Sequence, residues 1–171
     1  IVANSIADLN GVITEVNDKF LRIWGYASKD EVIGQPIAHF LSNSDECAAI
    51  LTALDGIGSW GGDFTAKKKD GSTFTAHSQA TIVRDEKGKA IGYQSAVEDI
   101  TESKRLEREV TQAKEAQFQA LMESLPSKVF LKDRNSVYLS CNENYARDLK
   151  IKPEEIRGKT DYDFFPTSLA V

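Results

Sequence analysis

The chain has 171 residues, which allows one to two domains at about 100–200 residues each. Hydrophobic residues make up 41% and charged residues 27%, enough for a core and ordinary for a globular chain. The formal net charge of −5 leaves no basic surplus to neutralise phosphates, so the composition argues against nucleic-acid binding.

The chain shows no targeting or membrane signal. No apolar run approaches the roughly 18 residues that span a bilayer, and no signal peptide is visible. We therefore expect a cytoplasmic location without direct membrane contact in this segment, while a longer parent protein could be tethered to a membrane. Cys47 and Cys141 stand far apart and are predicted to be free, buried thiols rather than a disulfide framework or metal cluster.

The first predicted elements are a hairpin and a helix. Short apolar-rich runs flank Asn10-Gly11 within residues 5–16, and both residues of this pair accept positive φ, which favours a tight hairpin turn. Asn17 is expected to cap the following helix. That helix shows apolar residues at helical spacing: Phe20, Leu21 and Trp24.

Two further helices are predicted before the hydrophobic pattern changes from helical spacing to the alternation of a strand. Residues 29–33 predict a short helix that Gly34 ends. Ser44-Asp45 is expected to cap a helix over 46–54, whose apolar stripe is Cys47, Ile50, Leu51 and Leu54. Four glycines are expected to end this helical region: Gly56, Gly58, Gly61 and Gly62.

Three strands follow, over residues 64–67, 74–83 and 90–98. In the second strand the even-numbered positions, which share one face, are Phe74, Ala76, Ser78, Ala80 and Ile82. His77 is at an odd-numbered position and so lies on the opposite face, and we therefore expect it outside the core. Two strands, short helices and then three strands predict an α+β domain with an antiparallel sheet.

A long helix is predicted next. Asp99-Ile100-Thr101-Glu102 fits a capping box, and Pro126 marks the end of the helical pattern. The helix carries a narrow apolar seam that includes Leu106, Val110, Ala113 and Leu121. We favour a two-chain parallel coiled coil through this seam over a single solvated linker helix, although the seam alone does not exclude an antiparallel pair.

The opening phrase of the chain occurs twice. Asp8, Asn10, Val12, Asn17 and Phe20 recur about 125 residues later as Asp133, Asn135, Val137, Asn142 and Tyr145. A period this long indicates two copies of a domain rather than a solenoid. We assign residues 1–101 to a first domain, 102–126 to the linker helix and 127–171 to a second domain that lacks the three later strands.

These motifs resemble the PAS superfamily of sensor domains. The resemblance rests on the run 8–17, on Trp60-Gly61-Gly62, on the turns at 69–74 and 84–89, and on Asp99-Ile100-Thr101-Glu102. It implies a five-stranded antiparallel sheet of order 2-1-5-4-3, with short helices over one face. The pocket between sheet and helices holds haem, flavin, a small metabolite or nothing in different members.

The resemblance also indicates which cofactors do not suit this chain. Flavin photoreceptors of the family carry a reactive cysteine where Ile37 stands here, and the expected haem-ligating helix, 46–54, has no histidine. Covalent flavin and histidine-ligated haem are therefore not expected, and no cofactor is favoured. The weak pocket candidates are Trp24, His39, Ile50, Leu54, Phe64, Ser78 and Ser95, of which the two serines could face a ligand or simply make room for larger side chains.

No catalytic motif is found, so we expect no enzyme activity in this segment. The resemblance implies a sensory and dimerising module that passes a signal through Asp99, Ile100 and Thr101 into the linker helix. The output would be a downstream domain such as a histidine kinase. The alternative is a ligand-free scaffold that dimerises and spaces other domains.

Overall fold

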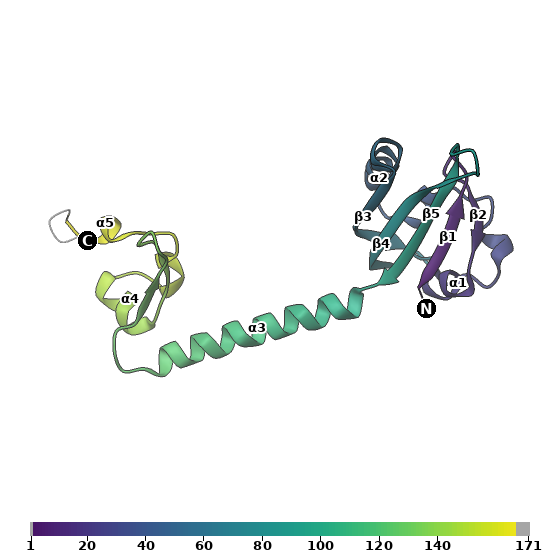
Figure 1. Cartoon of the computed structure of the whole chain (residues 1–171). Coiled ribbons are helices and arrows are strands. Elements are labelled where there is room, and N and C mark those ends of the chain that lie inside the picture. The colour runs from purple at the N-terminus through teal and green to yellow at the C-terminus, as the bar shows by residue number, and fades with distance from the viewer. Residues whose placement is uncertain (1, 167–171) are drawn as a thin grey trace. The chain divides into compact units, whose positions relative to one another are not determined.

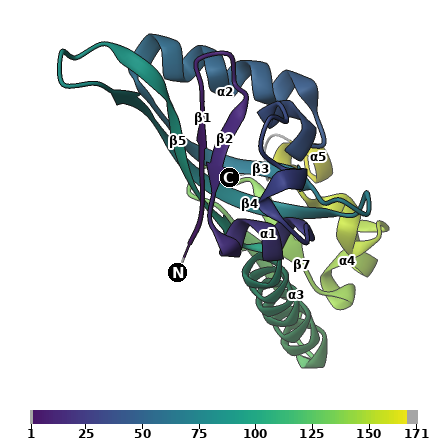
Figure 2. The same ribbon diagram turned by 90° about the vertical axis from the view of Figure 1, so that its right-hand side faces the viewer.

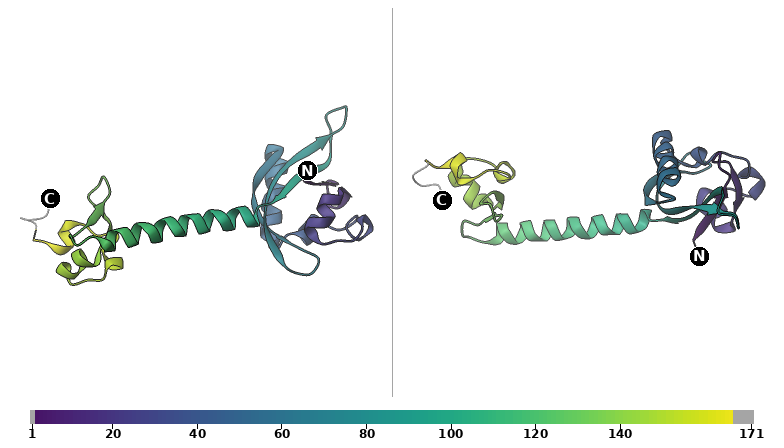
Figure 3. Two further views of the ribbon diagram at one scale, coloured as in Figure 1. Left: turned by 90° about the horizontal axis from the view of Figure 1, so that it is seen from below. Right: turned by 45° about the horizontal axis from the view of Figure 1, so that its top comes forward.

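The computed structural model describes residues 2–166 and divides the chain into two compact units, Ile1–Arg105 and Leu106–Val171. Figures 1 and 3 show the sheet and helices of the first unit, the long helix α3 (Thr101–Ser124) and the smaller second unit. The two units are described separately.

The first unit is an α+β domain built on one antiparallel sheet. Its five strands are β1 (Ala3–Ala7), β2 (Ile13–Val16), β3 (Ser59–Lys67), β4 (Thr73–Arg84) and β5 (Ala90–Asp99). They follow the spatial order β2-β1-β5-β4-β3, which confirms the predicted sheet. Gly92 permits β1 and β5 to approach closely, because a Cβ there would lie 2.3 Å from the Ala7 carbonyl oxygen.

The β1–β2 connection is a hairpin as predicted, but its turn is not the tight Asn10-Gly11 turn that we expected. Gly11 has a φ of 74°, whereas Asn10 keeps a negative φ. Asp8 Oδ1 accepts hydrogen bonds from the backbone N–H of Asn10 and of Val12, both at 2.9 Å. The Val12 N–H lowers the pKa of Asp8 because it favours the charged carboxylate. The aspartate therefore organises a loop longer than the two-residue turn that we expected.

The helices of the first unit cover one face of the sheet (Figure 2). They are α1 (Asp18–Trp24), two 3-10 helices (Lys29–Glu31 and Ile37–Phe40) and α2 (Ser44–Ile57). Asn17 caps α1 by accepting from the Phe20 N–H at 2.9 Å, as predicted. The cap of α2 is Asn43 rather than Ser44-Asp45, since the Asn43 side chain accepts from the Asp45 N–H at 2.9 Å.

The glycines around residue 60 do not all end a helix. Gly56 lies inside α2, and Gly58 caps it with a φ of 86°. Gly61 and Gly62 belong to β3, which starts five residues earlier than predicted. The Trp60 ring lies against Gly62, where a Cβ would meet the ring at 3.0 Å. Gly62 is therefore a packing position within a strand rather than a helix end.

An aromatic cluster forms the centre of the first core. Phe20 and Trp24 stack with ring centroids 4.1 Å apart, and Phe74 meets Trp24 edge-on at 5.2 Å. The indole N–H of Trp24 donates to the Phe40 carbonyl at 3.3 Å, so the buried ring keeps a hydrogen-bond partner.

The seam of α3 is exposed within this single chain. Leu106, Val110 and Leu121 are 49%, 52% and 60% exposed, and Ala113 is also exposed. At the start of the helix Asp99 Oδ1 accepts from the Thr101 N–H at 3.0 Å, whereas Glu102 accepts from the Arg105 side chain. Asp99 therefore caps the start of the helix through the N–H two residues on, not through the Glu102 N–H that the expected capping box requires, and Glu102 pairs along the helix instead.

The second unit contains a two-stranded antiparallel sheet and short helices. Its elements after α3 are β6 (Phe130–Lys132), β7 (Tyr138–Cys141), α4 (Glu143–Leu149), a 3-10 helix (Pro153–Ile156) and α5 (Asp161–Phe164). Its buried core is small and consists of Tyr138, Cys141, Ala146 and Ile156. Residues 167–171 of the predicted second domain lie outside the described residues.

Cys47 and Cys141 are free and buried, as predicted. Within residues 2–166 no helix combines the length and apolar composition that a bilayer crossing requires.

Candidate functional site

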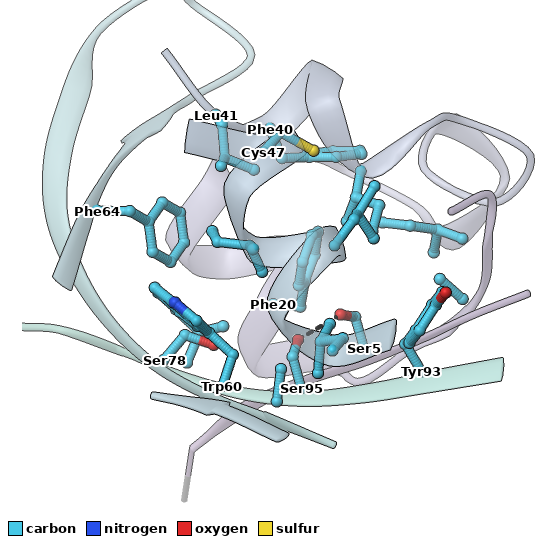
Figure 4. Close-up of a pocket in the computed structure, with 18 residues that line it drawn as sticks. Ser5, Phe20, Phe40, Leu41, Cys47, Trp60, Phe64, Ser78, Tyr93 and Ser95 are labelled. Carbon is cyan, nitrogen blue, oxygen red and sulfur yellow. Dashed lines mark hydrogen bonds between the residues drawn. The ribbon is translucent and has the colours of Figure 1, made fainter. Parts of the chain in front are cut away.

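A cavity lies between the sheet of the first unit and its helices (Figure 4). Its volume is about 70 Å³, several times the roughly 10–15 Å³ that one water molecule needs. The apolar face of α2 forms one wall through Cys47, Ile50, Leu51 and Leu54. The sheet forms the opposite wall with residues that include Ser5, Ser78, Ala80, Tyr93 and Ser95.

Aromatic side chains provide much of the lining. Figure 4 shows Trp60 and Phe64 together at one side of the cavity and Tyr93 at the other. The Trp60 and Phe64 ring centroids are 6.4 Å apart, and Phe20 and Phe40 add two further rings from the helical side. Such a lining favours a flat, apolar occupant.

Polar groups in the lining are few and neutral. The hydroxyls of Ser5 and Ser95 lie 2.8 Å apart and share a hydrogen bond across the β1–β5 pair. The Tyr93 hydroxyl donates to Asp55 Oδ1 at 2.6 Å, and this hydrogen bond raises the pKa of Tyr93 because it favours the neutral phenol. Burial raises the pKa of the Cys47 thiol, so this group is not an activated thiolate.

Most of the predicted pocket residues meet at the cavity, but two do not. Ile50, Leu54, Phe64, Ser78 and Ser95 all line it. The core cluster holds Trp24, whose ring packs between Phe20 and Phe74, so it does not reach the cavity lining. His39 is exposed, with its ring edge-on to Phe40, and so it is not a pocket residue. We therefore correct these two placements.

Sequence reasoning missed several lining residues. Ser5 shares the buried parity of β1 with Ala3 and Ala7, a signal that alternation along five residues could have supplied. Trp60 was missed because two glycines concealed the start of β3. Tyr93 lies on the same face of β5 as Ser95 and Val97, so alternation along this strand could also have identified it.

The residues at the cavity do not suit the covalent flavin or haem chemistry seen in some families with this fold. Ile37, which the resemblance aligns with the reactive cysteine, lines the cavity and offers only an alkyl group, and neither His39 nor His77 is among the described lining residues. Among residues 2–166 no group of three or more histidine, cysteine or acidic side chains could hold a metal ion.

The outer face of the sheet carries an ion-pair cluster. His77 lies outside the core as predicted, with Nδ1 2.7 Å from Asp63 Oδ1. Asp63 Oδ2 is 3.3 Å from Lys104 Nζ in the first turns of α3. The hydrogen bond from His77 and then that from Lys104 lower the pKa of Asp63. This cluster ties α3 to strands β3 and β4.

The predicted signal residues form a hydrogen-bonded junction between β4 and α3. The Ile100 N–H donates to the Thr75 carbonyl at 2.9 Å, and the Thr75 N–H donates to Thr101 Oγ1 at 2.9 Å. Thr101 in turn donates its N–H to Asp99 Oδ1. Since β4 also contributes Ser78 and Ala80 to the cavity, the junction and the cavity share one strand.

Comparison with known proteins agrees with this architecture. A family model described as PAS domain matches residues 2–102, which is more than half of the chain, and one described as PAS fold matches residues 122–171. No curated protein is similar enough to count as a match.

Solved structures share the fold. A PAS domain from Colwellia psychrerythraea is 26% identical, with a TM-score of 0.55 over 58% of this chain and 86% of that one. An RNA-binding light-oxygen-voltage receptor is 25% identical, with a TM-score of 0.56 over 68% of this chain and 34% of that one. The light-state dimer of the fungal blue-light photoreceptor Vivid is 23% identical, with a TM-score of 0.52 over 57% and 77%, and shows the fold alone. The chain therefore belongs to the PAS family, whose domains are sensory modules.

Proposed function

We propose that this chain is the sensory and dimerising segment of a signal-transduction protein. The input acts at the cavity of the first unit. The signal leaves through Asp99, Ile100 and Thr101 into α3 and on toward the second unit and an output partner such as a histidine kinase. The observation that carries the proposal is the junction, where the start of α3 is hydrogen-bonded to the strand that lines the cavity.

The coupling follows from the rigidity of a strand. Ser78 and Ala80 face the cavity, and Thr75 lies three residues before Ser78 on β4. A displacement of this part of β4 moves both backbone groups of Thr75, to which Ile100 and Thr101 are bonded. The first turn of α3 then shifts or rotates with the strand. A change of one position along the helix turns its face by about 100°.

The exposed seam of α3 supports the dimer. Leu106, Val110 and Leu121 leave apolar area in water that a second copy of the helix would cover. Val110→Asp would bury an unpaired charge in such a pair and should convert it to monomer, whereas Gln112→Asp adds the same charge off the seam and should not. Light scattering that shows a monomer at high micromolar concentration for the unmodified chain would contradict the dimer.

The signalling route is tested by filling the cavity. Ala80→Leu adds three carbon atoms to the lining and should alter amide hydrogen exchange over residues 101–108, because the strand moves. Ala96→Leu enlarges a half-buried position on the opposite face of the same sheet and serves as the control. Thr101→Val removes the hydroxyl that Thr75 binds and should abolish the response of α3 to Ala80→Leu. Thr111→Val removes a hydroxyl that bonds only within α3 and should not.

The alternative is a scaffold that dimerises and spaces other domains without sensing. It predicts the same dimer but no change in α3 when the cavity is filled. Identical exchange over residues 101–108 in Ala80→Leu and Ala96→Leu would favour the scaffold. We further propose that the segment has no catalytic activity of its own and acts only on its output partner.

A further inference from the structure

The lack of charged side chains in the described cavity lining limits which molecules can bind there. Among the residues described, the lining contains no aspartate, glutamate, lysine, arginine or histidine. A buried ion without a counter-charge loses several kcal/mol of hydration free energy, so an ionised molecule would be excluded. The carboxylate of Asp55 accepts the hydrogen bond of the Tyr93 hydroxyl, a lining group, and opposes an anion further.

From these features we propose that the cavity binds an uncharged, largely apolar ring compound with one hydroxyl-like group, held by the Ser5–Ser95 pair. The proposal rests on the proposed function, because a sensory module needs an input and the cavity is where the input acts. It adds the chemical class of that input.

The serine pair can hold one polar group. Two hydroxyls together have two donors and four acceptor lone pairs, and their mutual bond at 2.8 Å uses one donor and one lone pair. One donor and three lone pairs remain, so a ligand hydroxyl can donate to one serine and accept from the other. Figure 4 shows the pair on the sheet wall, between the Trp60 side and the Tyr93 side.

The other polar groups of the lining are less suited to this role, since the Ser78 hydroxyl has no second hydroxyl paired with it in the way that Ser5 is paired with Ser95. Tyr93 already donates its hydroxyl proton to Asp55, which leaves it only as an acceptor toward the cavity. The Cys47 thiol is a weak donor, and burial keeps it neutral. Among the described lining residues, Ser5 and Ser95 are therefore distinguished as two hydroxyls that lie within hydrogen-bond distance of each other, and the remaining lining selects apolar rings through Phe20, Trp60 and Phe64.

Four matched compounds test the charge and the polar group separately. Benzyl alcohol, ethylbenzene, benzylammonium and benzoate have nearly the same size and differ in one substituent. Each is titrated into the 15N-labelled 171-residue chain at neutral pH, and binding is measured from amide shifts. We expect benzyl alcohol to bind saturably and at least about tenfold more tightly than either ion. Equal or tighter binding of benzoate or benzylammonium overturns the proposal, and so does the absence of any binding by benzyl alcohol.

Two sets of variants locate the site. Ala80→Leu should abolish binding of benzyl alcohol, and Ala96→Leu, on the opposite face, should retain it. The double variant Ser5→Ala/Ser95→Ala should weaken benzyl alcohol about fivefold while ethylbenzene changes less than about twofold. This second test does not depend on whether Ala80→Leu packs well. Unchanged benzyl alcohol affinity in the double variant overturns the role of the serine pair.

The two proposals fail in different ways. If benzyl alcohol binds as described but residues 101–108 do not respond, the ligand class stands and the signalling route is wrong. If Ala80→Leu moves α3 but none of the compounds binds, the signalling route stands and the ligand class is wrong.

Discussion

The two copies of the opening motif fold identically at short range and differ in what they bury. In the first copy Asp8 Oδ1 accepts from the N–H of Asn10 and of Val12, and in the second Asp133 Oδ1 accepts from the N–H of Asn135 and of Val137. The four distances are 2.8–2.9 Å. A motif of a few polar residues therefore determines the hairpin regardless of its surroundings.

The helix cap repeats in the same manner. Asn17 Oδ1 accepts from the N–H of Phe20 and of Asn4, and its amide donates to the Val2 carbonyl. Asn142 Oδ1 accepts from the N–H of Tyr145 and of Val129, and its amide donates to the carbonyls of Ser127 and Met122. The second asparagine is fully buried and also holds the last turn of α3.

The two units differ in their buried cores. Five strands and two α-helices give the first unit an apolar aromatic core around Phe20 and Trp24. Up to residue 166 the second unit has two strands, and its central Tyr138 donates to Asp161 Oδ1 at 2.6 Å and lies 2.7 Å from the Tyr145 hydroxyl. Lys132 completes this network through an ion pair with Asp161. The number of covering strands, rather than the local motif, decides whether a core can be wholly apolar.

The largest expected difference is in hydrogen exchange. Amides of β6 and β7 should exchange at least about 100-fold faster than those of β4 and β5, because a two-stranded sheet over a small core opens more readily. The measurement is amide exchange of the 171-residue chain at several concentrations. Protection across residues 129–141 that equals that of β4 and persists in the monomer would show that the second unit is stable by itself.

The two cap asparagines should differ in their effect on stability. Asn142→Ala should lower the free energy of unfolding of the second unit by about 2 kcal/mol, since it leaves buried backbone groups unpaired. Asn17→Ala should cost the first unit about 1 kcal/mol. Both tryptophans, Trp24 and Trp60, lie in the first unit, so their fluorescence reports that unit, and exchange in β7 reports the other.

The control for this pair is Asn144→Ala, which removes only long hydrogen bonds of 3.3 and 3.4 Å to the carbonyls of Leu125 and Pro126. It should change the stability of the second unit by less than about 0.5 kcal/mol. Equal losses for Asn142→Ala and Asn144→Ala would mean that the buried cap is not special.

Acid should distinguish the two units. The hydrogen bond from Lys132 and then that from Tyr138 lower the pKa of Asp161, so the unfolded chain binds more protons than the folded chain in the acid range. The second unit therefore gains stability from this carboxylate above about pH 4 and loses it as the pH falls through the lowered pKa. In an acid titration, the far-UV circular dichroism signal should begin to change at a higher pH than the tryptophan fluorescence, which reports the first unit.

Asp161→Asn should reduce this pH dependence and lower stability at neutral pH, because Lys132 then loses its counter-charge. Coincident acid transitions by both probes would contradict a separate, carboxylate-dependent second unit.

A loss similar to that of Asn17→Ala is expected at the junction. Asp99→Ala should cost about 1 kcal/mol as a lost cap, measured by urea unfolding with tryptophan fluorescence. Asp99→Asn keeps an acceptor oxygen and should recover most of this loss. In a full-length parent, a coupling role predicts an output that is locked or insensitive to signal while the domain remains folded. An intact response in Asp99→Ala would leave Asp99 as a cap only.

Local patterns were sufficient to predict much of this molecule. Spacing along the chain revealed three features. They are the two copies of the opening motif about 125 residues apart, the alternation in β4 that predicted His77 on the outer face, and the apolar stripe of α2. These features depend on backbone periodicity and on short-range hydrogen bonds, which a sequence displays directly. The same information identified Ile50, Leu54 and Ser78 as pocket residues.

Other features were decided only by tertiary packing. Gly61 and Gly62 resembled a helix end, but they form a strand because the Trp60 ring needs the space beside Gly62. Trp24 was assigned to the pocket and instead fills the core, since α1 directs it toward Phe74. The Ser5–Ser95 pair joins residues 90 positions apart. Such pairings depend on which strands become neighbours in the sheet, and no local pattern encodes that choice.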